Sequence, residues 1–377
     1  MSLTLYRKYR PKNFAEVVGQ EHVVETLQGA IKTGRLAHAY LFTGPRGTGK
    51  TSLARLLAKA VNCDDRTKEG RPSGSEEVLS AVARSDACAV CGSCKEIEEG
   101  RAMDLIEIDA ASNRGIDDIR ALNEGARFSS ANGKHKVYVI DECHMLTKEA
   151  SNALLKTLEE PPAKTLFVLA TTEPHKVLPT IVSRVQKFDF KKLTADQIIF
   201  KLQRVASEEK IKITKDHLRL IARQAEGSLR DAESNLAKLI AFKGQEIDEQ
   251  AIKEVLGIIP LNFYHDFFQF VQAKKGTEAL GLISQLYESG LDLENFTKGL
   301  LDYARRVLVA RADPLDLNAF SVDLGEDSVQ KIVGLSKEID GKGILKLISA
   351  LMRAQQEIKV SPIPQLPLEI AVMELIS

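Results

Sequence analysis

The feature that most constrains the fold of this chain is a glycine-rich run, Gly44-Pro45-Arg46-Gly47-Thr48-Gly49-Lys50-Thr51. It matches the pattern G-x-x-x-x-G-K-[ST], with a short apolar run before it (39–42) and a helical run after it (52–60). In this context the glycines let the backbone wrap a phosphate chain, and the exposed N–H groups and the helix N-terminus face the anion. We therefore expect a phosphate-binding loop that extends to Ser52, with Lys50 at the terminal phosphates and the Thr51 hydroxyl on Mg²⁺.

Length, charge and hydropathy bound the class of protein. The 377 residues leave room for roughly two or three domains. The formal net charge is zero, so a nucleic-acid partner would have to be bound by a local cluster of basic residues. No apolar run approaches the ~18 residues of a membrane helix, and the charged N-terminus lacks the apolar segment of a secretory signal. We therefore expect a cytoplasmic protein with no membrane partner, in which clustered cysteines bind metal and do not form disulfides.

Strand and helix signals alternate over the first half of the chain. Apolar or alternating runs predict strands at 39–42, 105–110, 137–142, 166–172 and 185–190, the last of them at a sheet edge. Helical spacing and capping residues predict helices between them, at about 21–31, 52–60, 116–128 and 148–158. This alternation indicates a parallel α/β sheet covered by helices on both faces.

Only helix signals follow residue 190. Thr194 and Ser228 begin capping boxes, and Thr214 opens a helix between them, so we expect a small three-helix module that ends near residue 242. The chain from 248 to 377 is helical in pattern, most clearly in the i, i+3, i+4, i+7 apolar spacing at 344–351. The predicted order is an α/β domain, a helical module and a larger all-α domain.

The strand predicted at 137–142 ends in two acids, Asp141 and Glu142. In a nucleotide-binding sheet the first acid usually holds Mg²⁺, and the second can act as a general base toward the water that attacks the γ-phosphate. The pair therefore predicts nucleotide hydrolysis as well as nucleotide binding. The alternative is an acidic pair that only caps a strand.

Hydroxyls and arginines extend this candidate catalytic set. Thr171 and Thr172 end the next predicted strand, where one hydroxyl could bond the γ-phosphate or the attacking water, or could satisfy the loop backbone instead. Arg184 and Arg230 could stabilise charge on a transferring phosphoryl group, or could form surface ion pairs. The residues alone do not indicate which arginine serves its own subunit.

Four of the five cysteines are candidate metal ligands: Cys63, Cys88, Cys91 and Cys94. The C-x-x-C-x-x-C run brings three thiols onto one tight loop, and the fourth comes from the end of the helix that follows the phosphate-binding loop. Four thiolates describe a closed structural Zn²⁺ site, although an iron–sulfur cluster is a competing interpretation of this spacing. We interpret Cys143 as a small buried residue, and the polar stretch at 63–75 as an exposed insertion.

Together these motifs resemble one family, the gamma/tau subunits of bacterial DNA polymerase III, which are AAA+ ATPases of the sliding-clamp loader. The resemblance covers the whole chain and rests on the cysteines and the runs at 9–20, 44–51, 108–112, 141–146, 152–162, 170–172, 183–184 and 227–231. Two features depart from the family pattern. Val185 follows Ser-Arg where Cys is usual, which we expect to alter packing only, and the segment between Cys63 and Cys88 is longer than in the best-known members.

The resemblance implies an AAA+ P-loop domain at 1–180 with a zinc module at 63–94, a lid at 181–243 and a helical collar at 244–377. It also implies an adenine pocket formed by Tyr9, Arg10, Val17 and Val18. Arg230 would contact nucleotide in its own subunit, whereas Arg184 would act in trans on ATP held by a neighbour. The implied cofactors are ATP, Mg²⁺ and Zn²⁺.

The implied partners are other copies of the chain, the clamp-loader delta and delta-prime subunits, the sliding clamp and primer–template DNA. ATP binding would open the clamp and engage DNA, and hydrolysis would release the closed clamp on DNA. Longer family members carry further C-terminal domains that bind the helicase and the polymerase, so the sequence is compatible with a piece of a longer protein.

Contacts with DNA are the least defined part of this expectation. Arg114, Lys148 and Lys176 lie near predicted helix starts or loops, where they could hold phosphates, or could be solvated surface charge. Two other functions compete with an ATPase. A non-catalytic scaffold subunit would lose the phosphate-binding motif, which is intact here, and a helicase, suggested by the run Asp141-Glu142-Cys143-His144, would carry a second motor domain or strand-tracking motifs.

Overall fold

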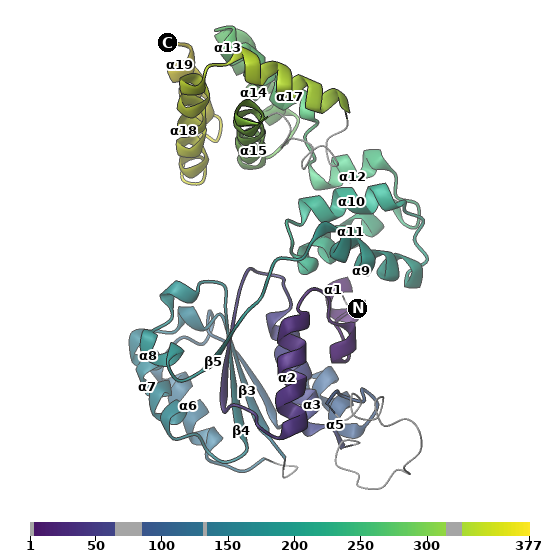
Figure 1. Cartoon of the computed structure of the whole chain (residues 1–377), viewed down its shortest axis with the longest axis vertical. Coiled ribbons are helices and arrows are strands. Elements are labelled where there is room, and N and C mark those ends of the chain that lie inside the picture. Colours follow the sequence, from purple (N-terminus) through teal and green to yellow (C-terminus); the bar gives the residue numbers. More distant parts are fainter. Residues whose placement is uncertain (1–3, 65–84, 131–133, 314–325) are drawn as a thin grey trace. The chain divides into compact units, whose positions relative to one another are not determined.

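The computed structural model describes residues 4–64, 85–130, 134–313 and 326–377 (Figure 1). The chain forms two compact units, Met1–Ala251 and Ile252–Ser377. The expected three-domain division at 180 and 243 stays a prediction. Among the residues that the structure describes, no helix combines the length and the apolar character needed to cross a membrane.

The first unit is built on a parallel sheet in the order β2-β3-β4-β1-β5. The strands are β1 (Ala39–Thr43), β2 (Leu105–Asp109), β3 (Lys136–Asp141), β4 (Thr165–Thr171) and β5 (Gln186–Asp189). Each lies within one or two residues of its predicted limits, and β5 is at an edge as expected. The fully buried β1 and β4 read as continuous apolar runs because both of their faces are covered.

Alternate residues of each strand contribute to different cores. Tyr40 and Phe42 pack with α2 (Glu21–Thr33), α3 (Lys50–Asn62) and α5 (Gly92–Glu99). Ala39 and Leu41 face the opposite layer, formed by α6 (Ile116–Ala126), α7 (Lys148–Glu159) and α8 (Pro179–Val182). Figure 1 shows α6 and α7 on one side of the sheet and α2 and α3 on the other. The expected coverage of both faces is confirmed, and the phosphate-binding loop joins β1, which lies between β4 and β5, to the buried α3.

Three helices follow β5 within the first unit: α9 (Ala195–Glu208), α10 (Lys215–Gln224) and α11 (Leu229–Lys243). Thr194 forms the predicted capping box with Gln197, and Thr214 caps α10. The capping box predicted at Ser228 is only half formed. The Ser228 hydroxyl accepts from the Asp231 N–H, but the Ser228 N–H donates to the Ala225 carbonyl and is therefore occupied.

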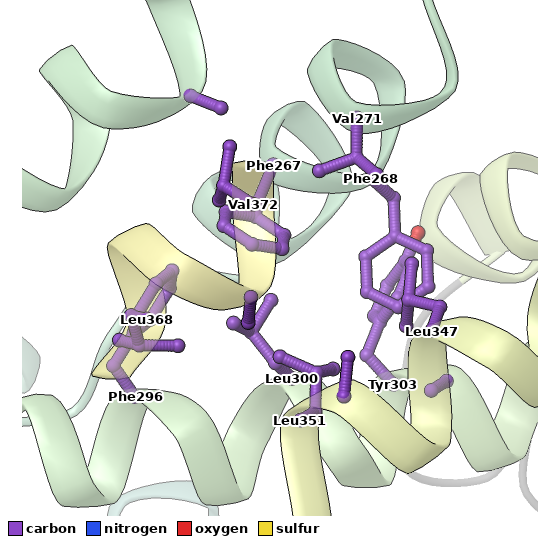
Figure 2. Packing of buried hydrophobic residues seen from close by; sticks show 14 of the residues in the cluster. Phe267, Phe268, Val271, Phe296, Leu300, Tyr303, Leu347, Leu351, Leu368 and Val372 are labelled. Atoms are coloured by element: carbon purple, nitrogen blue, oxygen red, sulfur yellow. The ribbon is translucent and has the colours of Figure 1, made fainter. Parts of the chain in front are cut away.

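The described residues of the second unit form only helices and their connections, as predicted. After α12 (Glu249–Leu256), within which the two units divide, its helices are α13 (Leu261–Gln272), α14 (Gly276–Glu288), α15 (Leu293–Ala312), α17 (Glu326–Glu338), α18 (Gly341–Ile358) and α19 (Leu366–Ile376). Figure 2 shows its core, in which the aromatic rings of Phe268 and Tyr303 lie beside the aliphatic Leu347. The apolar spacing at 344–351 forms the buried face of α18.

Candidate functional site

A cavity of about 270 Å³ lies in the first unit, over the phosphate-binding loop. Its walls come from four parts of that unit: the N-terminal arm, the loop and start of α3, the end of β3, and helices α9 and α11. Among the predicted site residues, the cavity is lined by Tyr9, Arg10, Val17, Val18, Arg46, Gly47, Thr48, Gly49, Lys50, Thr51, Ser52, Asp141, Glu142 and Arg230. The structure thus brings together residues that are separated by more than half of the chain.

The loop backbone depends on glycine at positions where another residue would be strained or would clash. Gly44, Gly47 and Gly49 all have positive φ values, of 143°, 75° and 99°. A Cβ atom at Gly47 would lie 1.9 Å from the Ser228 hydroxyl oxygen, and the Gly47 carbonyl accepts a hydrogen bond from the Leu229 N–H at 3.1 Å. The start of α11 is therefore held directly against the phosphate-binding loop.

The Lys50 ammonium is buried and bonded to its own loop. Its Nζ atom donates to the carbonyl oxygens of Gly44, at 2.7 Å, and Pro45, at 2.8 Å. Burial lowers the pKa of Lys50, and the negative charges of Glu142 and Asp141 oppose that shift. The Thr51 hydroxyl donates to Asp141 Oδ2 at 2.8 Å, so the two predicted Mg²⁺ ligands are neighbours.

Glu142 lies beyond β3 in a strained backbone conformation with a φ of 47°. Its Oε2 atom accepts hydrogen bonds from the Thr172 hydroxyl at 2.9 Å and the Thr172 N–H at 3.2 Å. Thr171 is buried and directed elsewhere: its hydroxyl oxygen accepts from the Glu173 N–H and lies 2.9 Å from Nδ1 of His144. Of the two predicted hydroxyls, Thr172 is therefore the one that contacts Glu142.

Sequence reasoning assigned no role to His144. Its Nδ1 atom lies 3.4 Å from Glu142 Oε2, and its Nε2 atom lies 3.1 Å from Glu173 Oε2. The imidazole thus joins the end of β3 to the loop after β4. Its position immediately after Glu142 and Cys143 was the available signal, because residues that follow an inner strand lie at the ligand-binding edge of the sheet.

Tyr6 and Arg230 connect the N-terminal arm to α11. The Arg230 guanidinium lies over the Tyr6 ring, 4.7 Å from its centroid. Both residues line the cavity, as do Lys201 and Glu233, and of these four only Arg230 was predicted. The other three have no motif around them, and their proximity depends on how α1 (Leu5–Lys8), α9 and α11 pack.

The remaining predicted residues lie outside the cavity wall. Arg184 forms an ion pair with Glu159 Oε1 at 2.8 Å and donates to the Thr180 carbonyl oxygen. Lys176 pairs with Glu173 at 2.7 Å, and Arg114 and Lys148 are exposed. These residues are not brought to the phosphate-binding loop of their own chain.

The four predicted metal ligands converge. The Sγ atoms of Cys63, Cys88, Cys91 and Cys94 lie within 4.8 Å of one another, and those of Cys63 and Cys91 are 4.0 Å apart. Tetrahedral Zn–S bonds of about 2.3 Å require sulfur atoms roughly 3.8 Å apart, so the cluster fits this ion. The neighbouring Cys63 thiol and burial both raise the pKa of Cys94, because a second thiolate is disfavoured here without a cation. Residues 65–84, which include most of the insertion predicted at 63–75, lie outside the described residues.

Cys143 is separate from this cluster and buried, with a pKa raised to about 12 by burial and by the nearby charges of Glu142 and Asp141. A thiol with so high a pKa is not a nucleophile near pH 7. This agrees with its interpretation as a small buried residue.

Three family models match successive parts of the chain. They are DNA polymerase III, delta subunit (residues 19–194), the ATPase lid domain of the DNA polymerase III clamp loader subunit (197–245) and domain III of DNA polymerase III subunits gamma and tau (247–377). DNA polymerase III subunit gamma of Buchnera aphidicola subsp. Acyrthosiphon pisum is 31% identical over 373 residues, which cover 99% of this chain and 98% of that protein. The chain belongs to the DNA polymerase III gamma/tau family.

Several relatives in this family are longer than the chain. DNA polymerase III subunit tau of Bacillus subtilis is 37% identical over 372 residues, and the chain spans 62% of its length. The chain spans about half of the length of other tau subunits that it matches. Among solved structures, the Thermotoga maritima RuvB Holliday junction branch migration motor has a TM-score of 0.48 and 19% identity, with 70% of this chain and 79% of that chain covered.

Proposed function

We propose that this gamma/tau family member is an ATP-hydrolysing subunit of the sliding-clamp loader, within the DNA polymerase III holoenzyme in the bacterial cytoplasm. One observation carries the proposal: Lys50, the hydrogen-bonded Thr51–Asp141 pair and Glu142 line a single cavity. A scaffold subunit of the same assembly would not need these four residues. Each of the four has a separate task in phosphoryl transfer.

At the phosphate end of the cavity, the residues from Arg46 to Ser52 surround the triphosphate with backbone N–H groups. The Lys50 ammonium exchanges its bonds to the Gly44 and Pro45 carbonyls for bonds to the terminal phosphates. Thr51 and Asp141 would hold Mg²⁺, which would supply positive charge against the phosphate oxygens when bound. Glu142 accepts the proton of the attacking water as a general base. The Thr172 hydroxyl orients the Glu142 carboxylate for this step.

The opposite end of the cavity receives the nucleoside. Val17 and Val18 provide apolar walls for adenine, and Tyr9 and Arg10 close this end from the N-terminal arm. Arg230 reaches the nucleotide of its own chain from α11. The contact between Arg230 and Tyr6 supports this role, because it ties the arm to the helix that also touches Gly47.

Arg184 acts on ATP that is bound to a neighbouring copy. Its guanidinium does not line the cavity of its own chain, and its side chain is 35% exposed beside Glu159. A neighbour's phosphates can compete for it because an exposed ion pair is weak, at roughly 0–1 kcal/mol. The assembly also includes delta and delta-prime subunits. Residues 1–180, 181–243 and 244–377 serve as ATPase domain, lid and collar.

Nucleotide binding in this assembly favours an open sliding clamp and binding of primer–template DNA, and hydrolysis releases the closed clamp on DNA. Arg114, Lys148 and Lys176 are proposed to contact DNA phosphates. Exposed cations of this kind bind the DNA backbone and do not recognise particular bases. The cysteine cluster holds a structural Zn²⁺ that braces the end of α3, and it takes no part in the reaction.

The test is ATP binding and hydrolysis by the chain assembled with its delta and delta-prime partners, with and without clamp and primed DNA. We expect ATP binding in every case and hydrolysis that rises when clamp and DNA are both present. Absence of ATP binding would leave the scaffold function. Strand displacement by the chain alone would favour the helicase.

A further inference from the structure

Glu233 is a buried acid with no role in the chemistry described above. It lies on α11, its side chain lines the cavity, and the residue is only 4% exposed. Its Oε1 atom is enclosed and has no hydrogen-bond partner among the residues that the structure describes. Because an unsatisfied buried oxygen is costly, such an atom inside a ligand cavity points to a donor that arrives with the ligand.

The charged groups around Glu233 do not satisfy it. Lys201, on α9, directs its Nζ atom to the Tyr9 carbonyl oxygen at 2.9 Å. Neither Lys201 nor Arg10 comes within ion-pairing distance of Glu233 among the described residues, although both exert a favourable charge on it. The other acid at this end, Glu16, is occupied by the Lys12 N–H and the Arg204 guanidinium. Glu233 is therefore the acceptor with free capacity.

Glu233 lies on the part of the cavity wall that we assign to the nucleoside, away from the phosphate-binding loop. Leu229, at the start of α11, is bonded to Gly47 of the phosphate-binding loop. Glu233 lies one turn further along the same face of the helix, away from the loop. Val17, Leu193 and Leu229 add apolar surface to the wall of the same cavity. A flat apolar group that carries a hydrogen-bond donor and is attached to phosphates at the loop would fit this end.

We propose that Glu233 accepts a hydrogen bond from the exocyclic amine at C6 of adenine and so selects ATP over nucleotides that lack this amine. The proposal rests on the proposed function, because it assumes a nucleoside triphosphate in the cavity. A purine without this amine offers no donor at C6, and the Glu233 oxygen would then stay without a partner. Glu233 is thus a specificity-determining residue and leaves the hydrolytic step unchanged.

The protonation of Glu233 agrees with this role. Burial raises its pKa to about 8, against the opposing charges of Lys201 and Arg10. Near pH 7 the side chain is therefore mostly a neutral carboxylic acid, which offers one acceptor and one donor. Adenine presents a complementary neighbouring pair, the C6 amine as donor and N1 as acceptor. Glutamine has the same donor–acceptor pair at every pH.

The test is a cycle between protein and ligand. Competition against a fluorescent ATP analogue at pH 7 measures the affinities of the assembled protein for ATP and for purine riboside triphosphate, which lacks only the C6 amine. We expect the wild-type protein to prefer ATP by about tenfold. In Glu233→Leu this preference should fall to near one, while the affinity for purine riboside triphosphate is maintained. Glu233→Gln should keep the preference, as should the matched control Glu16→Gln.

A wild-type preference near one would overturn the inference without any variant. A Glu233→Leu protein that keeps the preference would also overturn it, as would one that loses both nucleotides equally, because Glu233 would then have a structural role. If the wild-type protein binds neither nucleotide, the proposed function itself fails. Thermal unfolding of each variant establishes that it is folded, and the wild-type ratio decides the case if Glu233→Leu is not.

Discussion

The Thr172 hydroxyl donates a hydrogen bond of 2.9 Å to Oε2 of Glu142, the residue proposed as general base. The Thr172 N–H lies 3.2 Å from the same oxygen. The loop after β4 therefore orients a carboxylate that follows β3. His144 Nδ1 also lies 3.4 Å from this oxygen, so Thr172 and His144 together orient the Glu142 carboxylate.

Removal of this hydroxyl should slow hydrolysis without weakening ATP binding. We expect Thr172→Ala to lower clamp- and DNA-stimulated turnover by about tenfold, which corresponds to one hydrogen bond of about 1.4 kcal/mol. The Kd for ATP should stay within a factor of two or so, because Thr172 lies outside the cavity lining. Thr172→Ser keeps the hydroxyl and should restore most of the rate. Equal turnover in Thr172→Ala and wild type would exclude the orienting role.

Arg184 provides a test of catalysis between subunits. Arg184→Ala should leave ATP binding nearly unchanged, because the residue does not line its own cavity, and should strongly reduce stimulated hydrolysis. Mixed assemblies locate the effect: an Arg184→Ala copy should impair its neighbour's site and not its own. Reduced ATP binding with normal hydrolysis per bound ATP would contradict the assignment.

The cysteine cluster predicts one bound Zn²⁺ per chain. Chelation of the metal or Cys91→Ser should release it and lower the melting temperature of the first unit by several degrees or more, because Cys63 ends α3 and the cluster packs against it. Metal content by mass spectrometry and thermal unfolding measure the two effects. Cys143→Ala is the control and should retain the metal. Iron, sulfide and visible absorbance in the purified protein would instead indicate an iron–sulfur cluster.

Glu233 predicts a pH dependence of stability in the nucleotide-free protein. Its folded pKa of about 8 lies above the usual glutamate value of 4.5, so the folded state retains a proton that the unfolded state loses. Its contribution is therefore complete below about pH 4.5 and is lost as the pH rises toward 8. Relative to Glu233→Gln, the free energy of unfolding of the wild-type protein should fall by on the order of 2–4 kcal/mol between pH 5 and 8.5. Parallel pH profiles from denaturant unfolding would contradict the raised pKa.

Local motifs made part of this architecture predictable from sequence. The phosphate-binding loop, the acids after β3 and the cysteine spacing each place their chemistry within a few residues, and the strand positions follow from buried apolar runs. The contact between Thr51 and Asp141 also follows, because parallel strands end at one edge of the sheet.

Other features depend on tertiary packing and carry no local signal. Glu233 occupies a helix position whose burial is created by α9 and the N-terminal arm, and Tyr6 meets Arg230 only when that arm folds onto α11. Ser228 shows the limit of a local rule, since its N–H is bonded to Ala225 and the predicted capping box is left half formed.

The most direct test of the account is the effect of Glu142→Gln on the assembled protein. The amide cannot act as a general base, but it keeps the size of the side chain and an oxygen that Thr172 can bond. We expect the Kd for ATP to match that of the wild-type protein, while single-turnover hydrolysis with clamp and primed DNA falls by about 10²-fold or more. Hydrolysis at the wild-type rate with intact ATP binding would contradict the account.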